Sequence, residues 1–416
     1  MQAVAEPIDE RPMSGQQWWV LALCTLVILL DGLDLQAAAF TGPSIAAQWQ
    51  LERSSMGPIY AMGLAGGAVG ALLMGPLGDR YGRRPALLIS VLAFGTATLL
   101  TAWVRNFDQL LLMRLVTGIG LGGAMPNAAA LISEYAPRRR RNLCVAVTLT
   151  GIPLGGIVGG LLASWLLPRY GWPAVYVVGG LAPLATLPLL WRRLPESLEF
   201  LALRAAPVPA ANAVPADRAR FAVRELFQPG YVGDTLLLWT TFFTSLIALN
   251  FLMSWTPSLV LEAGFELRHT AWAAVALNLG GVGGPLLVAA LAARHGTRVL
   301  LPVTLLLAGS CVAITGRVSD SLPLLLLLTF CSGLFAFGAQ IGLVALATHV
   351  YPTHARATGV GWTIGIGRIG AVFGPLLGGL LLQAKLGLPN YFLTISSVLL
   401  IAAVSTALIR RHQPAA

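Results

Sequence analysis

The stretch Trp18–Phe40, WWVLALCTLVILLDGLDLQAAAF, is an apolar run that carries two carboxylates, Asp31 and Asp34. A helix of roughly 20 apolar residues crosses a hydrocarbon core of about 30 Å, so this run is long enough to span a bilayer. A charged side chain facing lipid at the centre of such a helix costs about 2.5–3.5 kcal/mol on insertion scales. The two acids therefore indicate a membrane helix with a polar face turned to a cavity.

The remainder of the chain repeats this apolar character. Of its 416 residues, 56% are hydrophobic and 11% are charged, whereas about a quarter of a soluble domain is charged. Continuous apolar runs favour helices over barrel strands, which show short alternating segments. The sequence predicts an all-α membrane protein with twelve transmembrane helices in two six-helix bundles. The predicted spans are Trp18–Phe40, Ile59–Gly78, Pro85–Val104, Leu110–Tyr135, Leu143–Leu167, Pro173–Leu190, Thr235–Trp255, Thr270–Ala292, Val299–Thr315, Leu322–Ala347, Ala357–Leu382 and Tyr391–Ile409.

The net charge of +10 has two interpretations, because basic residues attract nucleic acid and also collect on the cytoplasmic side of membrane proteins. With both termini cytoplasmic, 19 of the 27 basic residues fall in cytoplasmic segments and each of the six external loops holds one. This asymmetry favours topology over nucleic-acid binding. We expect a multi-pass protein of the bacterial inner membrane with cytoplasmic termini, the lipid bilayer as a partner and no nucleic-acid partner.

A polar, Pro/Ala-rich interruption divides the spans into two sets of six. It predicts an N-terminal bundle over residues 1–191, a cytoplasmic linker over 192–233 and a C-terminal bundle over 234–416. The halves also resemble each other, since GPLGDRYGRR and SEYAPRRRR in the first half have the counterparts LAARHGTR and THVYPTHAR in the second. A duplicated six-helix unit favours an alternating-access transporter.

An enzyme is the rival class, but the chain has no Ser/His/Asp set, metal-ligand spacing or phosphate-binding loop. Its five histidines fall at loops, span ends or the tail, and its four cysteines lie singly in different spans. We expect no enzymatic activity, no metal and no cofactor. The acidic N-terminal flank and the two aspartates argue against a cleaved signal peptide.

Four ionisable residues lie well inside predicted spans: Asp31, Asp34, Arg114 and Arg368. A spacing of three puts both aspartates on one helix face. Arg114 and Asp34 both fall in the outer half of their spans, so an ion pair between them is possible. Arg368 lies near the midplane and suits a substrate carboxylate, which a guanidinium binds through two parallel hydrogen bonds. We predict that the aspartates carry the proton; a permanent ion pair that locks helices together is the alternative.

Further polar and aromatic residues inside the spans are candidate substrate contacts, since an aromatic substrate favours ring partners. Packing or lipid contact is the alternative interpretation for each of them. The candidates are Asn127, Phe243, Asn250, Phe337 and Gln340. Arg114 is a further candidate substrate contact.

The loop GPLGDRYGRR, residues 75–84, also predicts a cytoplasmic latch. Its acid and its three arginines can form contacts between helix ends in one state and break them in another. The residues concerned are Asp79, Arg80, Arg83 and Arg84.

GPLGDRYGRR resembles the signature loop of the major facilitator superfamily. DGLDLQAAAF, LMRLVTGIGLGGAMPNAAALISEY, LPESLEFL and YPTHARATGVGWTIGIGRIGA resemble the aromatic acid:proton symporter family, whose members take up hydroxybenzoates, protocatechuate and phenylpropionates. The resemblance spans both halves. Within the family, GLDLQAA, the short linker and the overall length look most similar to those of 3-(3-hydroxyphenyl)propionate transporters, which carry glutamate at the position of Asp31.

The resemblance implies that Asp31 and Asp34 are required for transport. It also matches Arg368 to a family arginine of the eleventh span. Arg356 matches one at the cytoplasmic start of that span, and we expect it to take part in the latch. In the second copy of the signature loop, Ala293 stands where the first has Asp79, so a latch there would differ.

We expect a monomeric, proton-coupled importer of aromatic acids such as 3-(3-hydroxyphenyl)propionate, 4-hydroxybenzoate or protocatechuate. The alternative is a proton-coupled multidrug or other organic-anion transporter of the same superfamily. The fifth-span sequence GIPLGGIVGG lacks the Gly-Pro pair that is typical of drug exporters. A receptor that binds a ligand without carrying it would need no proton group.

Overall fold

The computed structural model describes residues 13–205, 226–228, 231–318, 321–351 and 356–410, and within them it contains helices and no strands. Much of the predicted linker lies outside the described residues. In the first half the helices are α1 Gly15–Gln48, α2 Met56–Tyr81, α3 Arg83–Thr101, α4 Phe107–Tyr135, α5 Arg141–Leu149, α6 Gly151–Tyr170, α7 Trp172–Arg193 and α8 Leu198–Ala205. In the second half they are α10 Val232–Glu262, α11 Leu267–His295, α12 Thr297–Thr315, α13 Leu322–Val350, α14 Arg356–Gln383 and α15 Leu388–Leu408.

Twelve helical segments of the described chain are long and apolar enough to cross a membrane. They coincide with the twelve predicted spans, which confirms the predicted fold class. Most helices extend a few residues beyond the predicted ends. Polar residues there continue the helical backbone hydrogen bonds, whereas the prediction followed the apolar residues alone.

The fifth predicted span lies within one membrane-spanning segment, Arg138–Tyr170, but its helix is divided at Thr150, which the sequence did not predict. Helix α5 ends at Leu149 and α6 begins at Gly151. Pro153 has no N–H to donate to the carbonyl of residue 149, and its ring would clash with that carbonyl in a regular helix. The hydroxyl of Thr150 at the junction donates to the Val147 carbonyl oxygen at 2.6 Å.

The chain forms two compact units. Unit 1 comprises Met1–Ile45 and Met62–Val208, and unit 2 comprises Ala46–Ala61 and Pro209–Ala416. The end of α1 and the start of α2 thus make their contacts within unit 2. There the ring of Tyr60 packs edge-on against Trp255 at a centroid distance of 5.3 Å.

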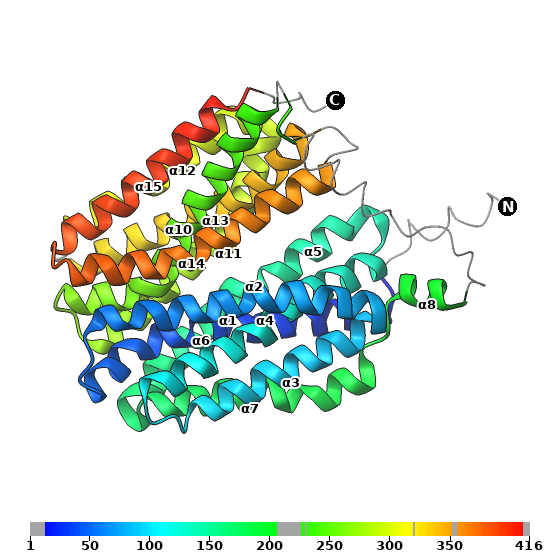
Figure 1. The fold of residues 1–416 in the computed structure, drawn as a ribbon, viewed down its shortest axis with the longest axis horizontal. Coiled ribbons are helices and arrows are strands. Elements are labelled where there is room, and N and C mark those ends of the chain that lie inside the picture. The colour runs from blue at the N-terminus through cyan, green and yellow to red at the C-terminus, as the bar shows by residue number, and fades with distance from the viewer. Residues whose placement is uncertain (1–12, 206–225, 229–230, 319–320, 352–355, 411–416) are drawn as a thin grey trace. The chain divides into compact units, whose positions relative to one another are not determined.

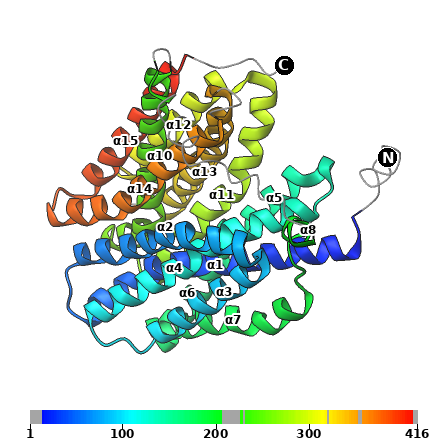
Figure 2. The ribbon, with the colours of Figure 1, turned by 45° about the vertical axis from the view of Figure 1, so that its right-hand side comes forward.

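Each unit has a hydrophobic core of its own. In unit 1, side chains such as Val27, Phe94 and Leu131 join α1, α3 and α4 in one buried cluster. In unit 2, Phe242 of α10 and Leu343 of α13 belong to a second cluster. Both ribbon views show α3 and α7 of unit 1 side by side, and they also show α12 beside α15 in unit 2 (Figures 1 and 2).

Glycines bring the same pairs of spans together in both halves. A Cβ added at Gly66 or Gly70 of α2 would collide with the main chain of α4. A Cβ at Gly280 or Gly284 of α11 would collide with the main chain of α13. Small residues allow membrane helices this close approach. Because each pair joins the second and fourth spans of its half, the equivalent contacts support the predicted duplication.

Candidate functional site

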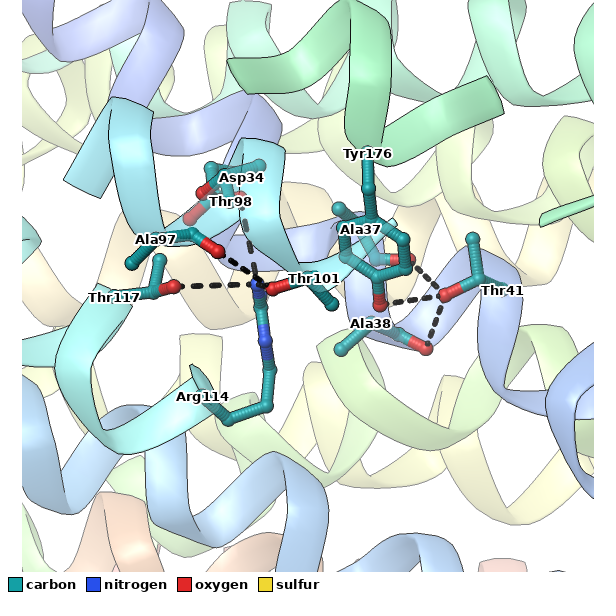
Figure 3. A network of polar contacts seen from close by, with 10 residues as sticks. All are labelled: Asp34, Ala37, Ala38, Thr41, Ala97, Thr98, Thr101, Arg114, Thr117 and Tyr176. Atoms are coloured by element: carbon teal, nitrogen blue, oxygen red, sulfur yellow. Dashed lines mark hydrogen bonds and ion pairs between the residues drawn. The ribbon is translucent and has the colours of Figure 1, made fainter. Parts of the chain in front are cut away.

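Asp34 of α1 lies in the interior of unit 1, with none of its surface exposed. The Thr98 hydroxyl of α3 donates to its Oδ1 at 2.7 Å, and Nη1 of Arg114 on α4 lies 3.8 Å from the same oxygen (Figure 3). That separation exceeds the 2.7–3.2 Å of an N–H···O hydrogen bond. The Oδ2 atom has no hydrogen-bond partner among the described residues. Asp34 is therefore only partly compensated, by one long ion pair and one hydroxyl.

The Arg114 guanidinium is also buried, with 4% of the residue exposed. Its Nη2 donates to the hydroxyls of Thr101 at 3.2 Å and Thr117 at 3.3 Å (Figure 3). Its Cζ lies 5.0 Å from the centroid of the Tyr176 ring, within cation–π range. The predicted proximity of Asp34 and Arg114 is confirmed. The hydrogen bonds that the Arg114 guanidinium donates to threonines are long, and it also contacts an aromatic ring.

Tyr176 of α7 connects this cluster back to α1. Its hydroxyl lies 2.8 Å from Oγ1 of Thr41, which itself donates to the Ala37 carbonyl at 2.8 Å (Figure 3). Since a threonine hydroxyl has one hydrogen, Tyr176 is the donor in the contact between them. Helices α1, α3, α4 and α7 all contribute to this polar cluster.

Sequence reasoning found two members of this cluster, Asp34 and Arg114, and missed the residues around them. Threonines in membrane helices commonly donate to a carbonyl of their own helix, so Thr98 and Thr101 carry no distinctive signal. Thr117 could have been found, because it lies three residues after Arg114 and so on the same helix face.

Asp31 lies one helical turn before Asp34, and 7% of it is exposed. Within the part of the chain that the structure describes, it takes part in no ion pair. Gly32 beside it packs against the backbone of Ile152 on α6. The two acids thus differ, since Asp34 has a cationic neighbour and Asp31 has none among the described residues. Their predicted proton-carrying role stays a prediction.

In unit 2, Arg368 is a partly buried residue of α14. It forms no ion pair within the described ranges of the chain. Gly370, two residues further on, lies against the backbone of Phe243 on α10. The Phe243 ring also packs at a tilt against Phe373, with centroids 5.9 Å apart. Arg368 and Phe243 are both predicted substrate contacts, and they lie on two helices that pack against each other.

The remaining predicted substrate contacts also have packing partners. Gln340 of α13 donates to the Ser245 hydroxyl of α10 at 2.9 Å. Asn250 donates to a carbonyl of its own helix at 3.0 Å, and Phe337 lies beside the position of a Cβ at Gly281. These three residues all belong to unit 2, and their contact with a substrate stays a prediction.

Asn127 of α4 belongs to unit 1 and is fully buried. Its Nδ2 donates to the Gly123 carbonyl at 2.8 Å and to the Met74 carbonyl at 3.4 Å. Its Oδ1 has no hydrogen-bond partner among the described residues and lies beside Gly78, at the end of α2. The observed contacts are those of helix packing between α2 and α4.

The signature loop is held by two acids. Asp79 pairs with Arg83 one turn later at 2.5 Å. Glu196, which follows α7, accepts a hydrogen bond at 3.1 Å from the main-chain N–H of Arg84 in the first turn of α3. Gly82 has φ of +107°, a conformation that favours glycine, and a Cβ there would meet the Glu196 carboxylate. Sequence reasoning quoted Glu196 without giving it a role.

The other predicted latch residues are more loosely placed. The Arg80 guanidinium lies 5.4 Å from the ring of its neighbour Tyr81. Arg356 is exposed and is the first residue of α14. Across the described residues, no group of three or more His, Cys, Asp and Glu side chains could hold a metal ion.

Comparison with known proteins gives one consistent result. The family model described as Major Facilitator Superfamily matches residues 24–284 and 264–416. Among solved structures, a D-xylose-proton symporter shares the fold with a TM-score of 0.76 at 18% identity, covering 94% of this chain and 97% of that one.

Three curated relatives are similar over nearly the whole chain. A gallate transporter of Pseudomonas putida is 40% identical, covering 94% of this chain and 91% of the relative. A 4-hydroxybenzoate transporter of Acinetobacter baylyi is 37% identical, covering 96% and 92%. A 3-(3-hydroxy-phenyl)propionate transporter of Escherichia coli is 38% identical, covering 97% of both. With a family match over most of its length and relatives that are transporters, not enzymes, this chain belongs to the Major Facilitator Superfamily.

Proposed function

We propose that the protein is a proton-coupled importer of hydroxylated aromatic carboxylates. The observation that carries this proposal is the buried acid pair of α1. Asp34 has one uncompensated oxygen, and Asp31 has no ion-pair partner among the described residues. A buried charge without a partner is costly, and a bound proton removes that cost. Two such carboxyl groups, one helical turn apart, are well suited to take up and release a proton during transport.

The second support is the chemistry of the substrates named for the relatives. Gallate, 4-hydroxybenzoate and 3-(3-hydroxyphenyl)propionate each have a carboxylate, an aromatic ring and a ring hydroxyl. Arg368 can bind the carboxylate through two parallel hydrogen bonds. Phe243 offers a ring surface, and the side-chain amides of Asn250 and Gln340 offer donors and acceptors for a ring hydroxyl. We assign these roles to unit 2 and the proton to unit 1.

The latch and the location complete the proposal. The Asp79–Arg83 pair is well suited to break and re-form during a conformational cycle, because the Asp79 side chain is 66% exposed and its desolvation cost is small. The latch would also include Arg80, Arg84 and Arg356, on the same side of the membrane. The arginine distribution supports insertion in a bacterial inner membrane with both termini cytoplasmic.

The test is uptake of radiolabelled aromatic acids by proteoliposomes with an imposed pH gradient. The wild type should accumulate a hydroxybenzoate when the outside is acidic. Asp31→Asn and Asp34→Asn should each abolish this accumulation, because an amide cannot release a proton. Exchange of labelled for unlabelled substrate at equal pH needs no net proton movement, so a folded variant should retain it. Normal proton-driven uptake by both variants would overturn the proton assignment.

A separate measurement tests the carboxylate site. Gallate, 4-hydroxybenzoate and 3-(3-hydroxyphenyl)propionate are screened for thermal stabilisation of the purified protein, and the best is repeated with Arg368→Ala. The variant should lose most of the stabilisation, because a bidentate charge-assisted interaction is removed. Unchanged stabilisation would move the carboxylate site to another residue.

A further inference from the structure

A groove on the side of unit 1, between α3 and α7, is a hollow that the proposed function does not use. It has a volume of about 540 Å³, and its lining is almost wholly apolar. Seven residues form it: Leu88, Ile89, Leu92, Leu184, Leu187, Pro188 and Trp191. Both ribbon views show these two helices next to each other (Figures 1 and 2). An apolar groove between membrane-spanning helices is a site for hydrocarbon.

The groove extends along α7 from Leu184 to Trp191, a distance of roughly 10 Å at 1.5 Å per residue. Its lining on α3 ends at Leu92, nine residues after the helix begins at Arg83. At 1.5 Å per residue this distance is roughly 13 Å, and half of a hydrocarbon core is about 15 Å. The lining on α7 reaches Trp191, two residues before that helix ends. The groove therefore lies in the half of the bilayer next to the loop end of both helices, and part of one acyl chain can occupy it.

The mouth of the groove is positively charged. Arg84 is the second residue of α3, and Arg192 lies in the last turn of α7 with an exposed side chain. The neighbouring Arg193 lies over the Trp19 ring of α1 instead, at 5.8 Å. The Arg84 guanidinium lies 5.5 Å from the Trp191 ring centroid, over a residue that lines the groove. Its Nη2 donates to the Trp191 carbonyl, while its Nε is buried without a hydrogen-bond partner among the described residues.

The acidic residues nearby are already engaged. Glu196 accepts hydrogen bonds from the main-chain N–H groups of Arg84 and Ser197. Asp79 pairs with Arg83. Two arginines, Arg84 and Arg192, thus remain at the mouth. The nearby Glu196 carboxylate is directed to backbone donors, so the balance of charge favours an anion.

We propose that this groove binds an anionic phospholipid, with one acyl chain between α3 and α7 and the phosphate at Arg84 and Arg192. Basic sites between helices on the cytoplasmic side suit anionic headgroups. Arginine is well suited to phosphate, because its fork of donors matches the phosphate oxygens. The loop that Arg84 ends is the predicted latch, so the lipid would occupy a position where it stabilises one arrangement of this loop.

The test is native mass spectrometry of the full-length protein with phosphatidylglycerol and with phosphatidylcholine of the same acyl chains. The wild type should retain one phosphatidylglycerol at least about tenfold more tightly than phosphatidylcholine, as expected for a headgroup at a cluster of arginines. Leu92→Trp fills the groove and should weaken retention of phosphatidylglycerol about tenfold, because acyl methylenes lose their burial.

Two matched controls separate the groove from general attraction to the membrane. Leu100→Trp lies on the same helix outside the groove, and Leu100 is 52% exposed where Leu92 is 51% exposed, so it should leave retention unchanged. Arg84→Gln should lose the preference for phosphatidylglycerol. Arg169→Gln should keep it, although Arg169 also lies over a tryptophan, Trp165, at 5.0 Å and donates to its carbonyl.

Three results would overturn the proposal. The first is equal retention of the two lipids by the wild type. The second is equal retention of phosphatidylglycerol by Leu92→Trp and Leu100→Trp. The third is a dimer that Leu92→Trp abolishes, because it would assign the groove to a second copy of the chain. Melting of each lipid-free variant shows that it is folded, and Ile89→Trp, also at a 51% exposed lining position, replaces Leu92→Trp if that variant does not fold.

Discussion

Replacing Arg114 by glutamine tests whether the buried pair of unit 1 is ionised. The substitution removes the only charge that an ion pair brings to Asp34 among the described residues. Glutamine retains a donor but cannot compensate a carboxylate. We expect Arg114→Gln to destabilise the protein by about 3–5 kcal/mol, the usual cost of leaving one member of a buried pair without its partner.

The distance sets the size of the coupling. Two unit charges 3.8 Å apart attract each other by about 4 kcal/mol at an effective dielectric constant of about 20. The contacts of Arg114 with the Thr101 and Thr117 hydroxyls, at 3.2 and 3.3 Å, are long and add little. The double variant Asp34→Asn/Arg114→Gln should therefore be less destabilised than the sum of its single variants, by about 2–3 kcal/mol.

The assay is equilibrium unfolding in mixed detergent micelles at pH 8, with the wild type, both single variants and the double variant. Arg105→Gln, an exposed arginine in the loop before α4, is the control and should change the free energy of unfolding by less than about 0.5 kcal/mol. Single-variant effects that add to within about 0.5 kcal/mol would refute the reasoning, because they would mean that Asp34 and Arg114 do not interact as charges.

Three further predictions concern contacts outside this pair. Glu196→Ala should lower the free energy of unfolding by about 1–2 kcal/mol in the same assay, because a carboxylate at the start of α3 is lost. Gly155→Ala should lower the melting temperature markedly, since its Cβ would collide with the Leu29 carbonyl of α1. Glu262→Gln should change the free energy of unfolding by less than about 1 kcal/mol, because the two side chains of its ion pair are largely solvated: Arg53 is 39% exposed and Glu262 is 42% exposed.

Two of these predictions have a control variant, and the third has an outcome that would contradict it. Gly75→Ala adds a Cβ with no atom within 4 Å and should not lower the melting temperature, so equal effects at both glycines would contradict the packing argument. Glu196→Gln, which keeps an acceptor, should be milder than Glu196→Ala; the reverse order would argue against the helix-end contact. A loss well above 1 kcal/mol in Glu262→Gln would show that this exposed pair is held more rigidly than its exposure implies.

The sequence by itself determined the class of fold. Its long apolar runs and few charges indicate a chain inside a membrane. There the backbone N–H and C=O groups must form hydrogen bonds within the chain, and continuous apolar runs do so as helices. It also located the unusual acids and arginines, since an ionisable residue in an apolar run is visible without any structure. The interruption of the fifth span at Thr150 was not predicted, although Pro153 provides its physical cause.

Only the tertiary structure decided what surrounds those charges. That Thr98 and Tyr176 meet the pair of Asp34 and Arg114 depends on how α1, α3, α4 and α7 pack, and hydroxyl groups in apolar helices carry no signal of their partners. The role of Glu196 and the groove beside Trp191 were likewise invisible, because both arise where segments distant in sequence come together. Composition fixes which residues must avoid lipid, whereas three-dimensional packing selects the neighbours that they find.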